Sequence, residues 1–225
     1  MKVLIISTHR SPTLTTGGNG LGRLAASLSI FIKNQGYEVD LFASRGSQVD
    51  GINILSYNSN LSALPDIVNR INKHNYDFII DFTHLKMLSR FHSHRKYPII
   101  NYIVDEECNY NPKNCVVANS YQKQTYSDSV IYPIGVDTEL FKPQSEKDDY
   151  FSFAGKIEKR KGYDLAIEIC KLASQRLILA GGIMPWEPDA RETLNGQEWV
   201  GEIKDNKKYN EFVGKSKCLL YPSRK

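Results

Sequence analysis

A short basic segment between two glycines holds the residues of this chain best suited to chemistry. It runs from Gly155 to Gly162, with Lys156 and Lys161 near its ends, between an apolar strand pattern and a helix pattern. Glycine at a strand end lets a ligand approach the backbone, and a helix N-terminus carries partial positive charge. A solvated basic turn is the alternative. The two glycines at a strand–helix junction favour a diphosphate site, with both lysines as point charges.

Composition narrows the class of protein. The 225 residues are 41% hydrophobic and 24% charged with a net charge of +4, and basic residues are interspersed with acidic ones, which argues against a nucleic-acid partner. We expect a cytoplasmic protein, because no apolar run is long enough to span a bilayer, although peripheral membrane contact stays open. The histidines at 84, 92 and 94 lack zinc-site spacing, so we expect no metal.

Short apolar runs alternate with helical patterns, which predicts an α/β fold with mostly parallel sheets. The expected strands cover residues 3–6, 39–43, 52–55, 77–81, 99–104, 115–118, 150–154, 176–180, 198–200 and 218–221. Residues 144–149 are wholly polar and follow an irregular run. They predict a linker between a first domain, residues 1–143, and a second, residues 150–225.

Several motifs, in order and with the right spacing, make the whole chain resemble the family 4 retaining glycosyltransferases. They are Gly17-Gly18 after the first strand, GYEVD at 36–40, VVANS at 116–120, PIGVD with FKP at 133–143, GKI…KG at 155–162, LILAGG at 177–182, VGEI at 200–203 and LLYPS at 219–223. The resemblance implies the GT-B fold, which has two Rossmann-like domains, here with the second one incomplete. The first domain would be the acceptor side, and the second would bind a nucleotide sugar.

The resemblance also implies an activity and roles for residues. A sugar would pass from a nucleotide-diphosphate donor to an acceptor with retention of anomeric configuration, without a metal or other cofactor. Lys156, where the family usually has arginine, and Lys161 would neutralise the leaving diphosphate. Gly155 would let the donor approach, Gly201 and Ile203 would contact the base, and the loop at Gly17-Gly18 would approach the phosphates or the sugar. The acceptor class stays open: a glycan, a lipid or a small molecule.

Two departures from the family pattern leave alternatives open. Phe82 stands where the family often has a donor-contacting histidine, and His84, two residues later, either replaces it or is only a loop residue. The family's two donor-binding glutamates would follow Ser223, where this sequence stops. We therefore also consider a nucleotide-sugar-binding pseudoenzyme, one subunit of a split enzyme, and another enzyme on a related scaffold, such as an epimerase. An uncovered second sheet would favour self-association or a partner chain.

Overall fold

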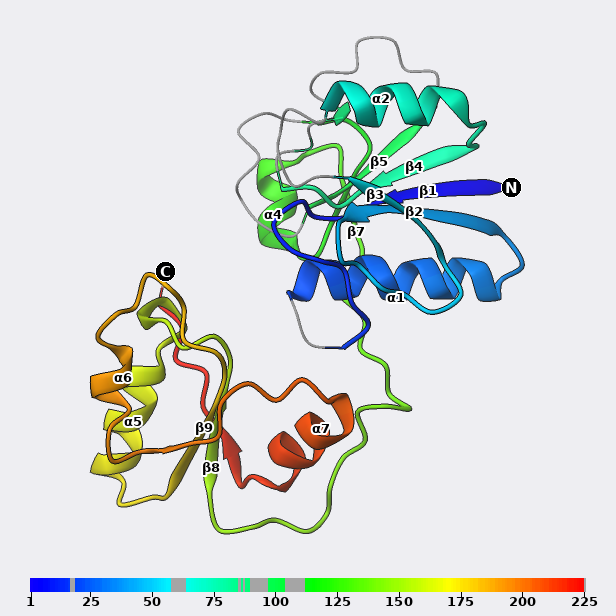
Figure 1. Ribbon diagram of the computed structural model, residues 1–225. Helices are drawn as coiled ribbons and strands as arrows, with labels where there is room; N and C mark the ends of the chain where they lie inside the picture. Colours follow the sequence, from blue (N-terminus) through cyan, green and yellow to red (C-terminus); the bar gives the residue numbers. More distant parts are fainter. Residues whose placement is uncertain are drawn as a thin grey trace. The chain divides into compact units, whose positions relative to one another are not determined.

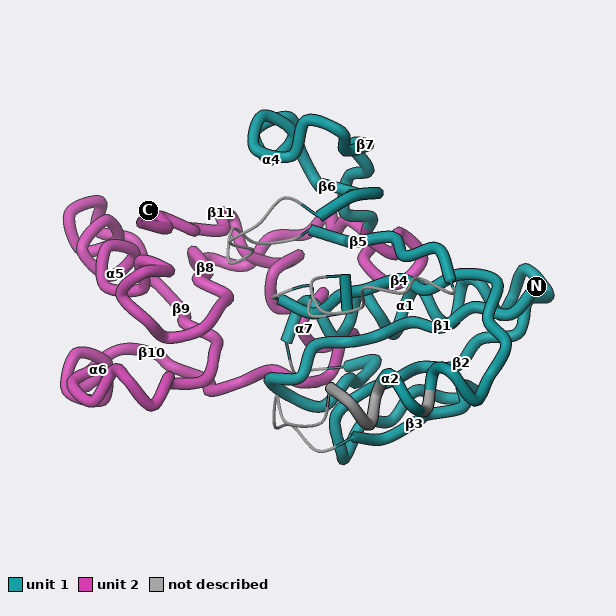
Figure 2. The backbone as a smooth tube through the Cα atoms, turned by 90° about the horizontal axis from the view of Figure 1, so that it is seen from above, with its two compact units in different colours: residues 1–135 teal, residues 136–225 magenta. Residues whose placement is uncertain are grey.

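The chain forms two compact α/β units, residues 1–135 and residues 136–225 (Figure 2). The structure is a computed structural model that describes residues 1–16, 19–57, 64–84, 86, 88–89, 97–103 and 112–224. The first unit contains β1 (Lys2–Ile6), α1 (Gly20–Asn34), β2 (Glu38–Ser44), β3 (Asn53–Tyr57), α2 (Leu64–Lys73), β4 (Phe78–Asp81), β5 (Ile99–Ile103), β6 (Cys115–Val117), α4 (Ser120–Thr125) and β7 (Val130–Ile131).

The first sheet is parallel throughout. Its seven strands lie in the order β3-β2-β1-β4-β5-β6-β7. The chain therefore winds outward from β1 through β2 to β3, then crosses back so that β4 pairs with the other side of β1. That reversal makes the β1/β4 boundary the topological switch point of the sheet, where open α/β sheets place their ligands.

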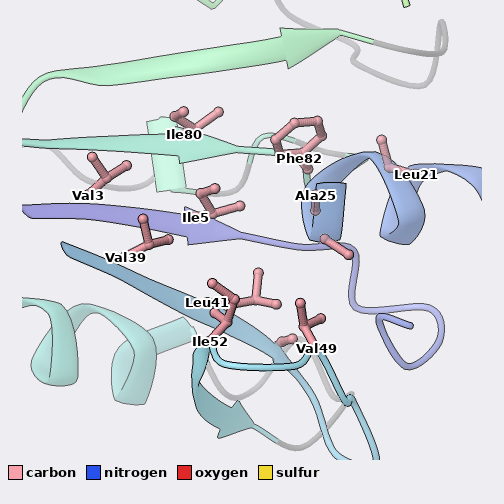
Figure 3. Packing of buried hydrophobic residues seen from close by; sticks show 12 residues of the cluster. Val3, Ile5, Leu21, Ala25, Val39, Leu41, Val49, Ile52, Ile80 and Phe82 are labelled. Atoms are coloured by element: carbon pink, nitrogen blue, oxygen red, sulfur yellow. The ribbon is translucent and has the colours of Figure 1, made fainter. Parts of the chain in front are cut away.

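Alternate residues of β1 supply cores on both faces of the first sheet. Val3 and Ile5 face α1, and with Leu21 and Ala25 of that helix they belong to the cluster shown in Figure 3. Leu4 and Ile6 of β1 belong to a second cluster, which includes Ile71 of α2. Figure 1 shows the two helices on opposite faces of the sheet. Burial on both faces explains why these strands read as unbroken apolar runs.

The second unit has the same construction on a smaller scale. It contains β8 (Phe151–Ala154), the 3₁₀ turn η2 (Lys159–Lys161), α5 (Tyr163–Leu172), β9 (Leu177–Ala180), α6 (Ala190–Thr193), β10 (Glu198–Trp199), α7 (Asn206–Lys215) and β11 (Cys218–Leu219). The parallel strands lie in the order β10-β9-β8-β11, so the switch point is between β8 and β11. In Figure 1, α5 and α6 lie on one face and α7 on the other.

The sequence-based expectation of an α/β fold with parallel sheets is confirmed. The second compact unit begins at Val136, and the polar segment before β8 packs against α7: the Asp148 N–H donates to the Lys215 carbonyl over 2.8 Å, and the Phe141 ring lies edge-on to Tyr209. The linker predicted at 144–149 and the domain boundaries around it stay predictions. The expected self-association also stays a prediction; β10 and β11 are the edge strands of the second sheet.

Candidate functional site

The basic loop predicted from the sequence begins where β8 ends, at the switch point of the second sheet. Its backbone is folded tightly: the Glu158 N–H donates to the Lys156 carbonyl over 3.0 Å, and the Lys161 N–H donates to the Glu158 carbonyl over 2.8 Å. Gly162 then takes a left-handed conformation (φ 76°), which lets the chain turn from η2 directly into α5. A side chain at this glycine would also collide with the Pro222 carbonyl oxygen.

Three glycines form a row across the carboxyl ends of β8, β9 and β10. A Cβ atom on Gly181, whose φ is 149°, would overlap the carbonyl oxygen of Gly155. The Gly181 N–H donates to the Gly201 carbonyl over 2.7 Å, and the Trp199 indole Nε1 donates to the Gly181 carbonyl over 2.9 Å. The fold therefore brings the predicted Gly155 and Gly201 to one edge of the sheet, joined through Gly181. Gly181 is buried and the other two glycines are half-buried, and the absence of side chains at this edge would let a ligand come near the main chain.

Lys161 is held against the strand segment on the other side of the switch point. Its Nζ lies 5.4 Å from the ring centroid of Tyr221, which follows β11 and stacks on Phe153 with centroids 6.1 Å apart. The same tyrosine ring lies close to Gly155: a Cβ atom built on this glycine would be 3.2 Å from Cε2 of Tyr221. Lys161 is half-buried, whereas Lys156, at the start of the loop, is exposed. Both predicted cations thus lie on a loop at the switch point.

The N-terminus of α5 already carries a carboxylate of the chain itself. Asp164 accepts hydrogen bonds from its own N–H and from that of Leu165, and its oxygens pair with both Nη atoms of Arg224 at 2.7 and 3.0 Å. Burial acts to raise the pKa of Asp164, but these hydrogen bonds and the guanidinium charge outweigh burial and hold it below its usual value. A phosphate at this edge would depend on the lysines and the glycine backbone more than on this helix end.

Arg224 also ties the end of the described chain to the basic loop. Its N–H donates to the Arg160 carbonyl over 2.8 Å, and its Nη1 donates to the Lys159 carbonyl over 2.5 Å. The Ser223 hydroxyl adds a 3.0 Å hydrogen bond to the Arg160 carbonyl. Segment 221–224 is therefore part of the wall of the candidate site.

The first unit presents polar side chains at its own switch point. β4 ends at Asp81, so His84 lies in the loop beyond it and does not continue the strand. Its ring lies edge-on to His9, which follows β1, with centroids 6.3 Å apart. Asp81 is fully buried; one carboxylate oxygen accepts from the Thr83 N–H at 2.7 Å and from its hydroxyl at 2.6 Å. Phe82 packs in the core, stacked on Tyr102.

Of the remaining predicted residues, the structure describes Ile203 alone. Gly17 and Gly18 lie outside the described residues, as do His92 and His94. Ile203 is half-buried, two residues beyond Gly201. No group of three or more His, Cys, Asp or Glu side chains in the described part of the chain is placed to hold a metal ion. Among the same residues, no helix has both the length and the apolar character to cross a bilayer. The roles proposed for the site residues stay predictions.

The two units, each built on a sheet of parallel strands, match the GT-B fold that is found in glycosyltransferases. The chain is similar to the crystal structure of AviGT4, a glycosyltransferase involved in avilamycin A biosynthesis, with a TM-score of 0.73 and 19% identity over 99% of this chain and 70% of that one. It is also similar to Acinetobacter baumannii MurG, with a TM-score of 0.53 and 12% identity over 97% and 71% of the two chains. These likenesses establish the fold. No family model matches the sequence, and no curated protein does.

Several residues of this candidate site are not evident from the sequence. Gly181 had a signal, because it begins a Gly-Gly pair at the end of an apolar strand, but that pair was read only as part of a strand motif. Tyr221 lies in the LLYPS motif, but neither its contact with the basic loop nor those of Asp164 and Arg224 had a local signal, since these contacts depend on β11 pairing beside β8. Strand order of this kind is not written in local periodicity.

Proposed function

We propose that this protein is a retaining glycosyltransferase that moves a sugar from a nucleotide-diphosphate donor to an acceptor without a metal ion. The observation that supports this most is the position of the basic loop. It leaves β8 at the switch point of the second sheet, with exposed Lys156 and half-buried Lys161 on it and a row of glycines beside it. A lysine held over an aromatic ring, a second, exposed lysine and neighbouring glycines suit a diphosphate leaving group.

Each part of the site has a role in the proposed reaction. Lys161, oriented by the Tyr221 ring, and Lys156 would stabilise the negative charge that grows on the diphosphate as the glycosidic bond breaks. This electrostatic term replaces the charge neutralisation that a divalent cation provides in other enzymes. Gly155, Gly181 and Gly201 would let the donor lie against the main chain, with the base nearest Gly201 and Ile203.

The first unit would provide the acceptor side. His84, next to His9, and the loop at Gly17-Gly18 would approach the sugar or the phosphates. The acceptor class remains a glycan, a lipid or a small molecule. We also propose a cytoplasmic location.

Titration calorimetry with UDP, GDP and ADP tests the nucleotide part of this proposal. We expect one of them to bind, and we expect Lys161→Ala to weaken it about 10- to 100-fold, as for the loss of a charge-assisted hydrogen bond. Lys159→Ala is the matched control, because this lysine lies on the same turn with an exposed side chain. Failure of all three nucleotides to bind at millimolar concentration would contradict the proposal, and equal effects of the two substitutions would contradict the roles.

The stereochemical part needs a transfer assay. NMR of the product should show the anomeric configuration of the donor sugar, and EDTA should leave the rate unchanged. An inverted product, or activity restored only by a divalent cation, would count against retention or metal independence respectively.

A further inference from the structure

The basic loop itself contains a buried carboxylate, that of Glu158, which has no part in the roles given so far. The Glu158 side chain is only 4% exposed. One of its oxygens accepts from Nη2 of Arg160 at 3.3 Å, and the other accepts from the indole Nε1 of Trp186 at 3.2 Å. Glutamate is rarely buried to this extent without partners, because its charge must be taken out of water. A buried carboxylate that is hydrogen-bonded through both oxygens, in the middle of a cationic turn, therefore needs an explanation.

Trp186 comes from a different segment, the loop after β9. Three further hydrogen bonds join that loop to the basic loop: the Ile157 N–H to the Gly182 carbonyl (2.9 Å), the Met184 N–H to the Ile157 carbonyl (3.3 Å) and the Lys159 N–H to Oε1 of Glu187 (2.8 Å). We call this set of contacts between the two loops the seam, and the side chain of Glu158 lies within it. Trp186 is 63% exposed, so burial does little to fix its ring, and its hydrogen bond to Glu158 ties it to the basic loop.

The charge of Glu158 matters as well as its hydrogen bonds. Lys156, Lys159, Arg160 and Lys161 lie within six consecutive positions of one turn, and their mutual repulsion would loosen that turn when no anion is bound. A carboxylate fixed under the turn offsets this repulsion without occupying the outer surface. The cations can then stay in place before the ligand arrives, and such preorganisation is what makes a charged site effective.

We propose that Glu158 is a positioning residue for the diphosphate site: through Arg160 and Trp186 it holds the loop that carries Lys156 and Lys161 in its binding geometry. This inference rests on the proposed function, since it assumes that the loop binds a nucleoside diphosphate. It adds a residue to that site which never touches the ligand.

The test is UDP, GDP or ADP binding, whichever the wild-type protein prefers, measured by calorimetry at a temperature well below unfolding. Glu158→Gln keeps the size and an acceptor oxygen but removes the charge, and we expect about tenfold weaker binding, as is usual when a group that orients a ligand-binding side chain is altered. Glu192→Gln, on exposed α6, should bind as the wild type does.

A second variant changes the other partner of the hydrogen bond between Glu158 and Trp186. Trp186→Phe keeps an aromatic ring but removes the N–H donor, so we expect weaker binding than in the wild type, by a smaller factor than for Glu158→Gln. It also keeps the test decisive should Glu158→Gln fail to fold. Melting temperatures of the ligand-free variants are measured in parallel.

A purely structural role would appear as a lower melting temperature with wild-type affinity in the folded variants, and that result would overturn the inference while leaving the proposed function intact. If the wild-type protein itself binds no nucleoside diphosphate, the proposed function fails, and the inference fails with it. Weaker binding by both variants with an unchanged Glu192→Gln control is the result that supports Glu158 as a positioning residue.

Discussion

Two glycines at the same sheet edge have left-handed backbone but very different surroundings, and this allows a paired test. A Cβ atom at Gly181 (φ 149°) would overlap the Gly155 carbonyl, whereas at Gly201 (φ 75°) nothing lies within 4 Å. We expect Gly201→Ala to cost about 1 kcal/mol of stability from backbone strain alone. Gly181→Ala should cost more, about 2–4 kcal/mol, because two main chains must separate. Chemical denaturation measures both, and equal losses would show that the strands do not approach as described.

Asp81 gives the first unit a pH dependence whose sign can be stated. Burial raises its pKa above the ordinary 3.8, outweighing the opposing effects of Lys86 and Thr83, and its Oδ2 has no hydrogen-bond partner in the described structure. Above pH 3.8 the unfolded chain loses this proton while the folded chain keeps it, so stability falls as pH rises towards the folded-state pKa. Asp81→Asn should remove that downward slope.

Denaturant unfolding followed by circular dichroism between pH 4 and 7 checks this. Asp128→Asn, an exposed position in the same unit, is the control and should follow the wild-type curve. A wild-type slope that persists unchanged in Asp81→Asn would mean that this carboxyl group ionises normally in the folded protein.

At the scale of elements, the segment after β11 and the start of α5 depend on one bidentate pair. Asp164 has a lowered pKa in the folded state, so its pairing with Arg224 stabilises the protein above the ordinary pKa of 3.8 and is lost as pH falls through the folded-state value. Arg224→Ala should therefore be less stable than the wild type at neutral pH and nearly as stable in strong acid.

Arg224→Lys separates the effect of the charge at this position from that of the guanidinium hydrogen bonds. It keeps the charge but cannot reach both carboxylate oxygens and the Lys159 carbonyl at once, so we expect an intermediate stability. Thermal unfolding of the three proteins at pH 7 and pH 2.5 measures the difference. A gap between wild type and Arg224→Ala that does not shrink in acid would place the arginine's contribution in its carbonyl contacts, contrary to this expectation.

Elements with strong local signals were predictable from the sequence, and those defined by distant partners were not. The strand expected at 77–81 is β4 (Phe78–Asp81), and the helix pattern expected after Gly162 is α5 (Tyr163–Leu172), because three consecutive apolar residues or a helical apolar period decide such elements locally. The two-residue β7 (Val130–Ile131) was missed. Among the described residues it pairs with β6 alone, and both of its residues are exposed. The sequence therefore shows no alternation of buried and exposed positions there.

The same distinction applies to the candidate site. Lys156 and Lys161 can be proposed from the sequence because glycine, basic residues and glycine lie close together at a strand end. Glu158 reads as one more polar residue of that loop, and its importance depends on Trp186, 28 positions further on. Arg224 reaches Asp164 across 60 positions. Contacts of that range follow from the strand order, which the alternation of polar and apolar residues does not encode.

At the scale of the whole molecule, two units wound in the same way each present polar groups at a switch point, and the proposed function gives them different parts of one substrate. The nucleotide is assigned to the loops after β8, β9 and β10, the transferred sugar to His84, and the sugar or the phosphates to the loop at Gly17-Gly18. On this assignment a nucleotide sugar should affect the region of His84 in the first unit, whereas a nucleotide alone should not.

Hydrogen exchange measured with each ligand tests the division. A bound nucleoside diphosphate should slow exchange at residues 155–162, 181–187 and 201–203, and at 100 times its dissociation constant it should add about 2.7 kcal/mol to the stability of the second unit. The corresponding nucleotide sugar should slow exchange at the same segments and, in addition, near residues 82–84. Protection confined to the second unit with both ligands would remove the first unit from donor binding, since a sugar that contacts its loops must shield their amides.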